Sequence, residues 1–139
     1  MREILFRGAQ KVDCAKLLIW YEGSLIIETD GYTGEKEYYI QNENGSYLVI
    51  PETVGQYAEL SDRDCNKIFE GDILRRAYHP EDDVAVLWHD GRFSFKRAKK
   101  INKDYPFEAE CCVQNAVKRL KIIGNIHDNP ELLKEADNE

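Results

Sequence analysis

The side chains best suited to metal binding or nucleophilic catalysis are three histidines and four cysteines. Zinc sites need several imidazole or thiolate ligands brought together, but His79, His89 and His127 stand far apart and no two cysteines have a C-x-x-C spacing. Adjacent residues of a strand point to opposite faces, so Cys111 and Cys112 make a poor chelate. We therefore expect no metal site and no cofactor, with histidines in loops, buried cysteines and no disulfides.

Acid–base catalysis needs positioned carboxylates or histidines, and Asp62 with Asp64 or Asp82 with Asp83 would be the candidate carboxylate pairs. Runs of acidic residues in loops are usually solvated, so we expect these four side chains to face water. No sequence signature places a cysteine beside a histidine, and the glycines stand at separate turns rather than in a phosphate-binding loop. The sequence thus predicts a protein without catalytic residues, which is not an enzyme.

Charge is the most distinctive feature. The chain of 139 residues has a net charge of −7, and residues 1–70 hold 7 basic and 13 acidic side chains. Residues 92–121 hold 9 basic and 3 acidic side chains. These basic residues are Arg92, Lys96, Arg97, Lys99, Lys100, Lys103, Lys118, Arg119 and Lys121. The patch has three open interpretations: a solvated surface, a contact with a protein or a second copy, or a nucleic-acid groove with Tyr105 and Phe107 as stacking platforms.

The elements that position these residues are predicted to be strands. Aromatic and β-branched residues are frequent, which favours half-buried sheets. Residues 17–21 and 25–29 are apolar runs that we expect to be two strands, joined by a turn at Glu22, Gly23 and Ser24. Asn44 and Gly45 predict a hairpin. We expect residues 51–66 to be a turn-rich connection with one helical turn.

Residues 68–126 read as about five short, bent strands, which we expect to close into a small SH3-like barrel. Asp90 and Gly91 form a turn, after which Phe93 and Phe95 should face inward and Arg92, Ser94 and Lys96 outward. Gly71 should adopt positive φ, Asp72 should bond nearby backbone N–H groups, and Gly124 should mark a bulge. Finally, Asn129 and Pro130 predict the N-cap and first residue of a short helical turn that packs Leu132 and Leu133 against the barrel.

The expected organisation is an N-terminal β-meander region, residues 1–60, and a C-terminal barrel with its cap, residues 61–139. The first residues lack the apolar stretch of a signal peptide, and no segment reaches the roughly 20 apolar residues that span a bilayer. We expect a cytoplasmic protein that has no membrane contact.

Four blocks of the chain resemble the YopX family: ILFRG at residues 4–8, PETVGQY at 51–57, KIFEGDI at 67–73 and IGNIHDNPELL at 123–133. These are small proteins encoded by bacteriophages and prophages, so the resemblance implies a bacterial host cytoplasm and a C-terminal SH3-like barrel. It implies no known activity and therefore no catalytic or binding residue. The chain departs from the family at residues 20–23, at the basic residues 97–103 and at Cys111–Cys112.

The leading hypothesis is a non-enzymatic interaction module that contacts a host or phage protein, or a second copy of itself as a homo-oligomer. The alternative is a small nucleic-acid-binding barrel that uses the basic patch of residues 92–121.

Overall fold

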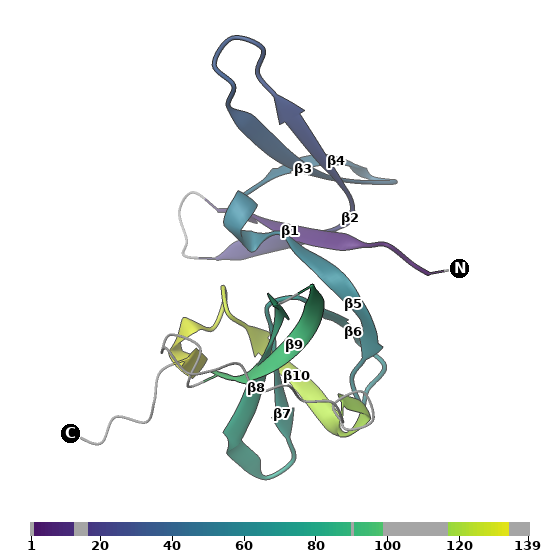
Figure 1. The fold of residues 1–139 in the computed structure, drawn as a ribbon, viewed down its shortest axis with the longest axis vertical. Helices are drawn as coiled ribbons and strands as arrows, with labels where there is room; N and C mark the ends of the chain where they lie inside the picture. Colours follow the sequence, from purple (N-terminus) through teal and green to yellow (C-terminus); the bar gives the residue numbers. More distant parts are fainter. Residues whose placement is uncertain (1, 13–16, 90, 99–116, 134–139) are drawn as a thin grey trace, which may run out of the picture. The chain divides into compact units, whose positions relative to one another are not determined.

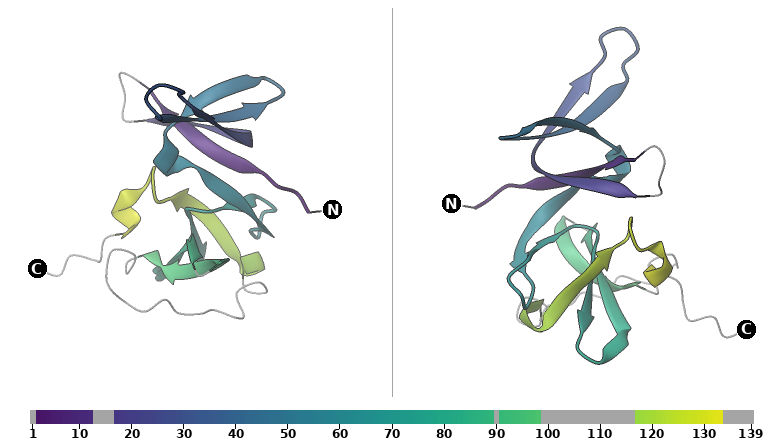
Figure 2. Two further views of the ribbon diagram at one scale, coloured as in Figure 1. Left: turned by 45° about the horizontal axis from the view of Figure 1, so that its top comes forward. Right: turned by 180° about the vertical axis from the view of Figure 1, so that it is seen from behind.

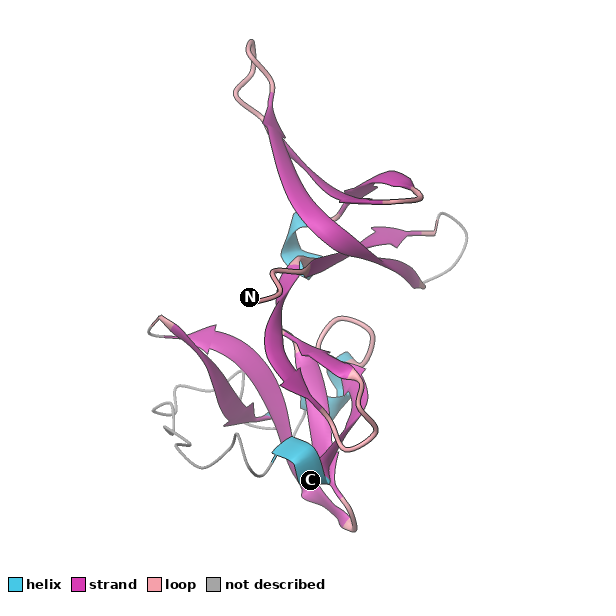
Figure 3. Cartoon of the chain, turned by 90° about the vertical axis from the view of Figure 1, so that its right-hand side faces the viewer, coloured by secondary structure: helices cyan, strands magenta, loops and turns pink. Residues whose placement is uncertain are grey.

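The computed structural model describes residues 2–12, 17–89, 91–98 and 117–133, and these form a mostly-β protein, as predicted (Figure 1). The described strands are interrupted only by turns and short 3-10 helices (Figure 3). The chain divides into two units, Met1–Tyr57 and Ala58–Glu139. Among the described residues, no helix has the length and apolar character that crossing a membrane requires.

The N-terminal unit is an antiparallel meander in which each strand pairs with the next. Its strands are β1 (Phe6–Lys11), β2 (Leu18–Thr29), β3 (Lys36–Asn42) and β4 (Gly45–Val49). The 3-10 helix η1 (Pro51–Thr53) follows β4, and the first residues of β5 (Gly55–Ser61) return to pair with β1. The predicted hairpin at Asn44–Gly45 is present between β3 and β4, although its two turn residues are Glu43 and Asn44.

The predicted turn at residues 22–24 is wrong, because β2 runs through it as one strand of 12 residues. β2 pairs with β1 up to Gly23 and with β3 from Ser24 onward. A Cβ added to Gly23 would lie 2.2 Å from the backbone oxygen of Gln41 on β3. Gly23 is therefore needed where a neighbouring backbone comes close, a role that glycine has inside strands.

The sheet of the N-terminal unit curls so that its last strand approaches its first. The N–H of Ile50 donates to the oxygen of Ala9 at 2.8 Å, and the N–H of Ala9 donates to Oγ1 of Thr53 at 2.9 Å. Ile40 and Val49 are buried against Gly8, which has no side chain to obstruct them. This curled sheet is the scaffold of the candidate site below.

The C-terminal unit contains a four-stranded antiparallel sheet in the order β10-β7-β8-β9 (Figure 2). Its strands are β7 (Asp72–Arg76), β8 (His79–His89), β9 (Arg92–Arg97) and β10 (Leu120–Asn125). The short strand β6 (Lys67–Phe69) lies beside β5, η3 (Val117–Arg119) precedes β10, and η4 (Pro130–Leu133) follows it.

Two buried clusters stabilise this unit. One contains Ile68, Leu74, Val86 and Phe95, and the other packs Ile73, Ala85 and Ala98 against the partly buried Leu132 and Leu133. The predicted inward placement of Phe95 and the packing of the two leucines are therefore confirmed.

Several local predictions in this unit are confirmed. Gly71 has a φ of +96°, and Oδ2 of the buried Asp72 accepts the N–H of Phe69 at 2.8 Å. The register of β10 shifts between Ile122 and Gly124, which is the predicted bulge. Gly91 has a φ of +76° in the turn between β8 and β9, whereas Asp90 lies outside the described residues.

Other predictions are corrected. Residues 55–61 form strand β5 rather than loop, and Ser94 is buried rather than exposed. Asn129 does not act as a side-chain N-cap of η4; its Oδ1 accepts the N–H of Asn125 at 3.2 Å, on the side toward β10. Since Gly124 lies beside that oxygen, the asparagine closes the turn after the bulge instead of starting the helix.

Candidate partner-binding groove

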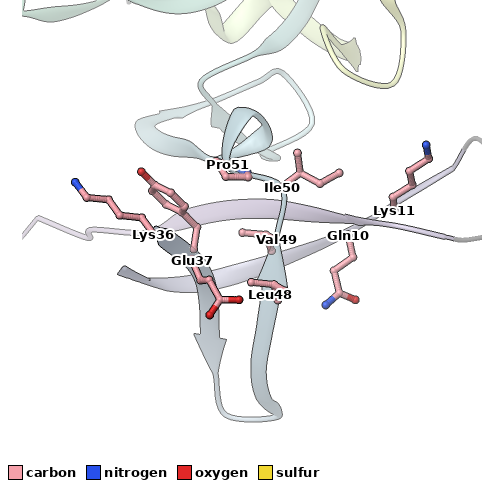
Figure 4. A pocket seen from close by; sticks show the side chains of 9 residues that line it. Gln10, Lys11, Lys36, Glu37, Leu48, Val49, Ile50 and Pro51 are labelled. Atoms are coloured by element: carbon pink, nitrogen blue, oxygen red, sulfur yellow. The ribbon is translucent and has the colours of Figure 1, made fainter. Parts of the chain in front are cut away.

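A groove of about 510 Å³ opens on the N-terminal unit (Figure 4). It is lined by residues that are distant in the sequence but adjacent in the curled sheet, from the end of β1, the start of β3, the end of β4 and the start of η1. These residues are Gln10, Lys11, Lys36, Glu37, Tyr38, Leu48, Val49, Ile50 and Pro51. The sequence predicted none of these residues as a site.

The groove exists because β4 leaves β3 early. The pairing of these strands ends at Tyr38 and Val49, after which Ile50 turns away to bond with β1. The first two residues of β3, Lys36 and Glu37, thus continue beyond the end of β4. An extended chain laid along this free length of strand would meet a sheet edge, which is a natural site for strand addition.

The floor of the groove is apolar and its ends are charged. Leu48 leaves 48% of its surface exposed, and Figure 4 shows Leu48 and Val49 between Lys36 at one end and Lys11 at the other. Within the described part of the chain, neither lysine has an ion-pair partner. The groove therefore offers apolar contact in its centre and two positive charges at its rim.

Glu37 adds a negative charge to the groove, and it lies directly opposite Glu28 on β2. Like charges in a cross-strand pair repel. Burial raises the pKa of the Tyr39 hydroxyl, and the charges of Glu37 and Glu28 raise it further. This acidic face is the side of the β2–β3 hairpin on which Tyr39 lies.

The β2–β3 hairpin continues past β4 as an arm whose tip is residues 30–35 (Figure 1). At the tip, Oδ1 of Asp30 accepts the N–H of Tyr32 at 2.7 Å and that of Thr33 at 3.2 Å, and the N–H of Asp30 donates to the oxygen of Glu35 at 2.8 Å. The two bonds to its carboxylate lower the pKa of Asp30. These bonds close the loop, and the ring of Tyr32 is fully exposed.

The basic patch predicted from the sequence is only partly described by the structure. Lys99, Lys100 and Lys103, like Tyr105 and Phe107, lie outside the described residues. Arg92, Lys96 and Arg97 belong to β9, whereas Lys118 and Arg119 belong to η3 and Lys121 to β10. Because β9 and β10 are opposite edges of the four-stranded sheet, with β7 and β8 between them, these residues are not neighbours within the sheet. The patch remains a prediction.

The acidic residues of the C-terminal unit differ from the prediction, because two of them are buried. Asp83 lies within β8, and its two oxygens accept Nε and Nη2 of Arg75, each at 2.8 Å, in a bidentate pair. Asp62 is likewise buried and accepts backbone N–H groups. Cys65 is a free thiol, as predicted, but it is exposed rather than buried; the other cysteines lie outside the described residues.

One cluster has ligand-type side chains close together, at the start of β8. Single ligand atoms of His79, Glu81 and Asp82 lie within 4.8 Å of one another. However, Oδ2 of Asp82 accepts Nη2 of Arg76 at 3.1 Å, and its Oδ1 lies 3.7 Å from Nη2 of Arg97. Since two guanidinium groups already neutralise this carboxylate, the cluster is an ion-pair network on the surface.

Comparison with known proteins gives the chain its family. The family model described as YopX protein matches residues 10–134, which is most of the chain. The chain belongs to the YopX family. This YopX chain is also similar in fold to a crystal structure of protein EF1440 from Enterococcus faecalis, with 22% sequence identity and a TM-score of 0.53 over 95% of this chain and 99% of the other. No curated protein matches the YopX chain.

Proposed function

We propose that this YopX-family chain is a non-enzymatic interaction module, and that its N-terminal unit binds an extended protein segment in the groove beside β4. One observation supports this most: an exposed apolar floor that lies between two lysines at the free end of a strand. The groove lining contains no histidine, cysteine, serine or threonine. The setting we propose is the cytoplasm of a bacterium that carries the phage or prophage, with the C-terminal unit as an SH3-like scaffold.

The chemistry of the groove defines its ligand. A tyrosine or leucine side chain would cover Leu48, and carboxylates on either side of it would meet Lys11 and Lys36. A backbone segment beside Lys36 would add main-chain hydrogen bonds to the sheet edge. We therefore expect a ligand with one central aromatic or aliphatic residue and acidic residues on both sides.

Selection from a displayed library of random peptides tests this proposal. Peptides enriched on the wild-type protein and depleted by the Lys11→Glu/Lys36→Glu double variant should share a large apolar residue with flanking Asp or Glu. Their affinity for the double variant, measured by fluorescence anisotropy, should be about tenfold lower or weaker still, because two attractive charges become repulsive.

A Lys118→Glu/Lys121→Glu variant is the matched control, since it makes the same charge change on exposed residues of the C-terminal unit. It should bind the selected peptides like the wild type. If both double variants weaken binding equally, or if no peptide distinguishes the groove variant from the wild type, the groove is not the site.

Nucleic-acid binding is the second candidate, and Trp88 favours it. This ring remains 53% exposed near the end of β8 and packs edge-on against Phe93, with 4.9 Å between ring centroids. Arg97 lies on the adjacent strand, on the same face as Phe93. Such an aromatic with nearby cations is the stacking arrangement used for single strands. An electrophoretic shift at low salt that is abolished in Trp88→Ala and in Arg97→Glu would support this function. If neither single-stranded DNA nor single-stranded RNA is shifted, nucleic-acid binding is rejected.

A further inference from the structure

We infer that β4 of a second copy of this chain pairs antiparallel with β4 along its open edge, so that two N-terminal units join in a symmetric dimer. The inference rests on the proposed function, because it identifies the extended segment bound beside β4 as this same strand. It is carried by the backbone groups along the edge, by the composition of the strand and by the charges at its ends.

The open edge of β4 presents backbone groups that β3 does not use. β4 is the first strand in the order β4-β3-β2-β1-β5-β6, so among the described strands only β3 pairs with it. The hairpin turn has two residues, so Asn42 and Gly45 exchange hydrogen bonds, and every second pair along the two strands does the same. The N–H and oxygen of Ser46 and of Leu48 therefore point away from β3. The N–H of Ile50 points the same way, since it donates to an oxygen of β1.

β4 also lacks the features that protect the other edge strands of the described chain. Exposed edges are usually short, charged or bulged, which prevents them from pairing. β6 has only three residues, β9 carries three basic side chains, and β10 carries Lys121 and the bulge before Gly124. In contrast, residues 45–50 read Gly-Ser-Tyr-Leu-Val-Ile, without a charge, a proline or a register shift. An uncharged segment of this kind on an open edge favours pairing with another strand.

A two-fold axis at Tyr47 pairs the open groups of both copies. In that register Ser46 of each copy lies opposite Leu48 of the other, and the two residues exchange N–H···O bonds. The register overlaps the whole of β4, because Gly45 lies opposite Val49. The two Leu48 side chains, each 48% exposed in the single chain, lie diagonally on one face of the joined sheet and cover apolar surface. Because each copy uses the same surface, the contact closes at a dimer.

The same register brings opposite charges together at both ends of the contact. The turn residue Glu43 of one copy extends past the end of β4 in the other, toward Ile50 and Pro51 of the groove lining. Lys11 lines the same groove on the open-edge side of β4, away from the lysine of β3 (Figure 4). Glu43 and Lys11 are both exposed, and neither has an ion-pair partner within the part of the chain that the structure describes. Their reciprocal attraction fixes the register and the antiparallel direction.

Sedimentation velocity of the full chain over a concentration series tests the inference. The wild type should reach a dimer and no larger species. Ser46→Pro should raise the dissociation constant about tenfold or more, because it removes an outward N–H and obstructs the edge. The monomer should tolerate this proline, since that N–H does not serve the pairing with β3. Ser46→Ala keeps the backbone group and is the control, so it should dimerise like the wild type.

Charged variants test the side chains of the contact. Leu48→Lys places two positive charges diagonally across the axis and should also raise the dissociation constant about tenfold. Ile27→Lys is its control, because Ile27 is likewise 48% exposed but lies on β2, inside the sheet. Glu43→Lys and Lys11→Glu should each weaken the dimer by about fivefold. A chain that carries both of these changes should dimerise like the wild type, because opposite charges face each other again.

Amide hydrogen exchange followed by NMR identifies the pairing strand. As the protein concentration rises, the N–H groups of Ser46 and Leu48 should exchange more slowly, whereas that of Tyr47 already bonds to β3 and should change little. A chain that stays monomeric over the whole series overturns the inference, as does a dimer that Ser46→Pro leaves unchanged or that leaves these two amides unprotected. Selected peptides that bind a monomeric chain would retain the proposed function and reject only the second copy; failure of both experiments would reject both.

Discussion

Replacing Gly23 with alanine is expected to destabilise the N-terminal unit by about 3 kcal/mol or more, because the new Cβ has no space. It would lie 2.2 Å from the backbone oxygen and 2.8 Å from the carbonyl carbon of Gln41, so relief requires β2 and β3 to separate. Hydrogen exchange followed by mass spectrometry should show faster exchange along both strands, with the C-terminal unit protected as in the wild type. Urea unfolding monitored by circular dichroism gives the free energy.

Gly31→Ala is the matched control on the same hairpin. A Cβ at Gly31 has no atom within 4 Å, and the residue does not have a positive φ. Its effect should stay within about 0.5 kcal/mol of zero. If Gly23→Ala is as mild as this control, the two strands do not approach each other as described.

Replacing Asp62 with alanine is expected to lower the free energy of unfolding of the C-terminal unit by about 2–3 kcal/mol. The Oδ1 atom of Asp62 accepts the N–H groups of Asp64 and Asn66, both at 2.9 Å, and Oδ2 accepts the N–H of Ile122 on β10 at 3.0 Å. The carboxylate thus joins the loop after β5 to a strand 60 residues away. Alanine leaves these donors without their acceptor. Urea unfolding, with Asp64→Ala as control, measures the loss; the exposed Asp64 should cost less than about 0.5 kcal/mol.

The effect of Asp62 should depend on pH in a defined direction. Burial opposes ionisation of Asp62 and raises its pKa, but the N–H donors of Ile122, Asn66 and Asp64 outweigh burial and lower it below 3.8 overall. The carboxylate therefore stabilises the fold fully above the pKa of the unfolded chain, and this contribution is lost as the pH falls through the lower folded value. The wild-type and Asp62→Ala unfolding free energies should converge below that range. A constant difference down to strongly acidic pH would contradict this assignment.

The sequence predicted elements well where a single residue type determines local conformation. Gly71 with Asp72 and the bulge at Gly124 fall into this group, because positive φ, short-range side-chain bonds and broken alternation are encoded within a few residues. The prediction failed where contact with a strand distant in the sequence determines the local conformation. Gly23 was predicted to be a turn residue. It lies inside the long strand β2, at a point where the backbone of β3 comes too close for a side chain.

The charged residues show the same division. Asp62 and Asp83 were expected to be solvated because their sequence neighbours are polar, yet Ile122 and Arg75 supply partners that no local pattern reveals. The groove could not be predicted for a similar reason, since its lining comes from three separate segments that meet only after β4 curls toward β1. The turn at residues 30–35 did carry a sequence signal. Asp30 stands two residues before Tyr32, whose N–H it accepts, and the segment contains Gly31 and Gly34.

The most direct test of the groove is an NMR titration of the isotope-labelled full chain with a selected linear peptide that has one central large apolar residue and an acidic residue on either side of it. Binding in the groove predicts progressive amide shifts at Lys11, Lys36, Leu48 and Ile50. These shifts should be absent in the Lys11→Glu/Lys36→Glu variant and with a peptide that has alanine in place of the central apolar residue. Amides of the groove that stay fixed at saturating peptide, with shifts concentrated instead around Trp88 and β9, would contradict it.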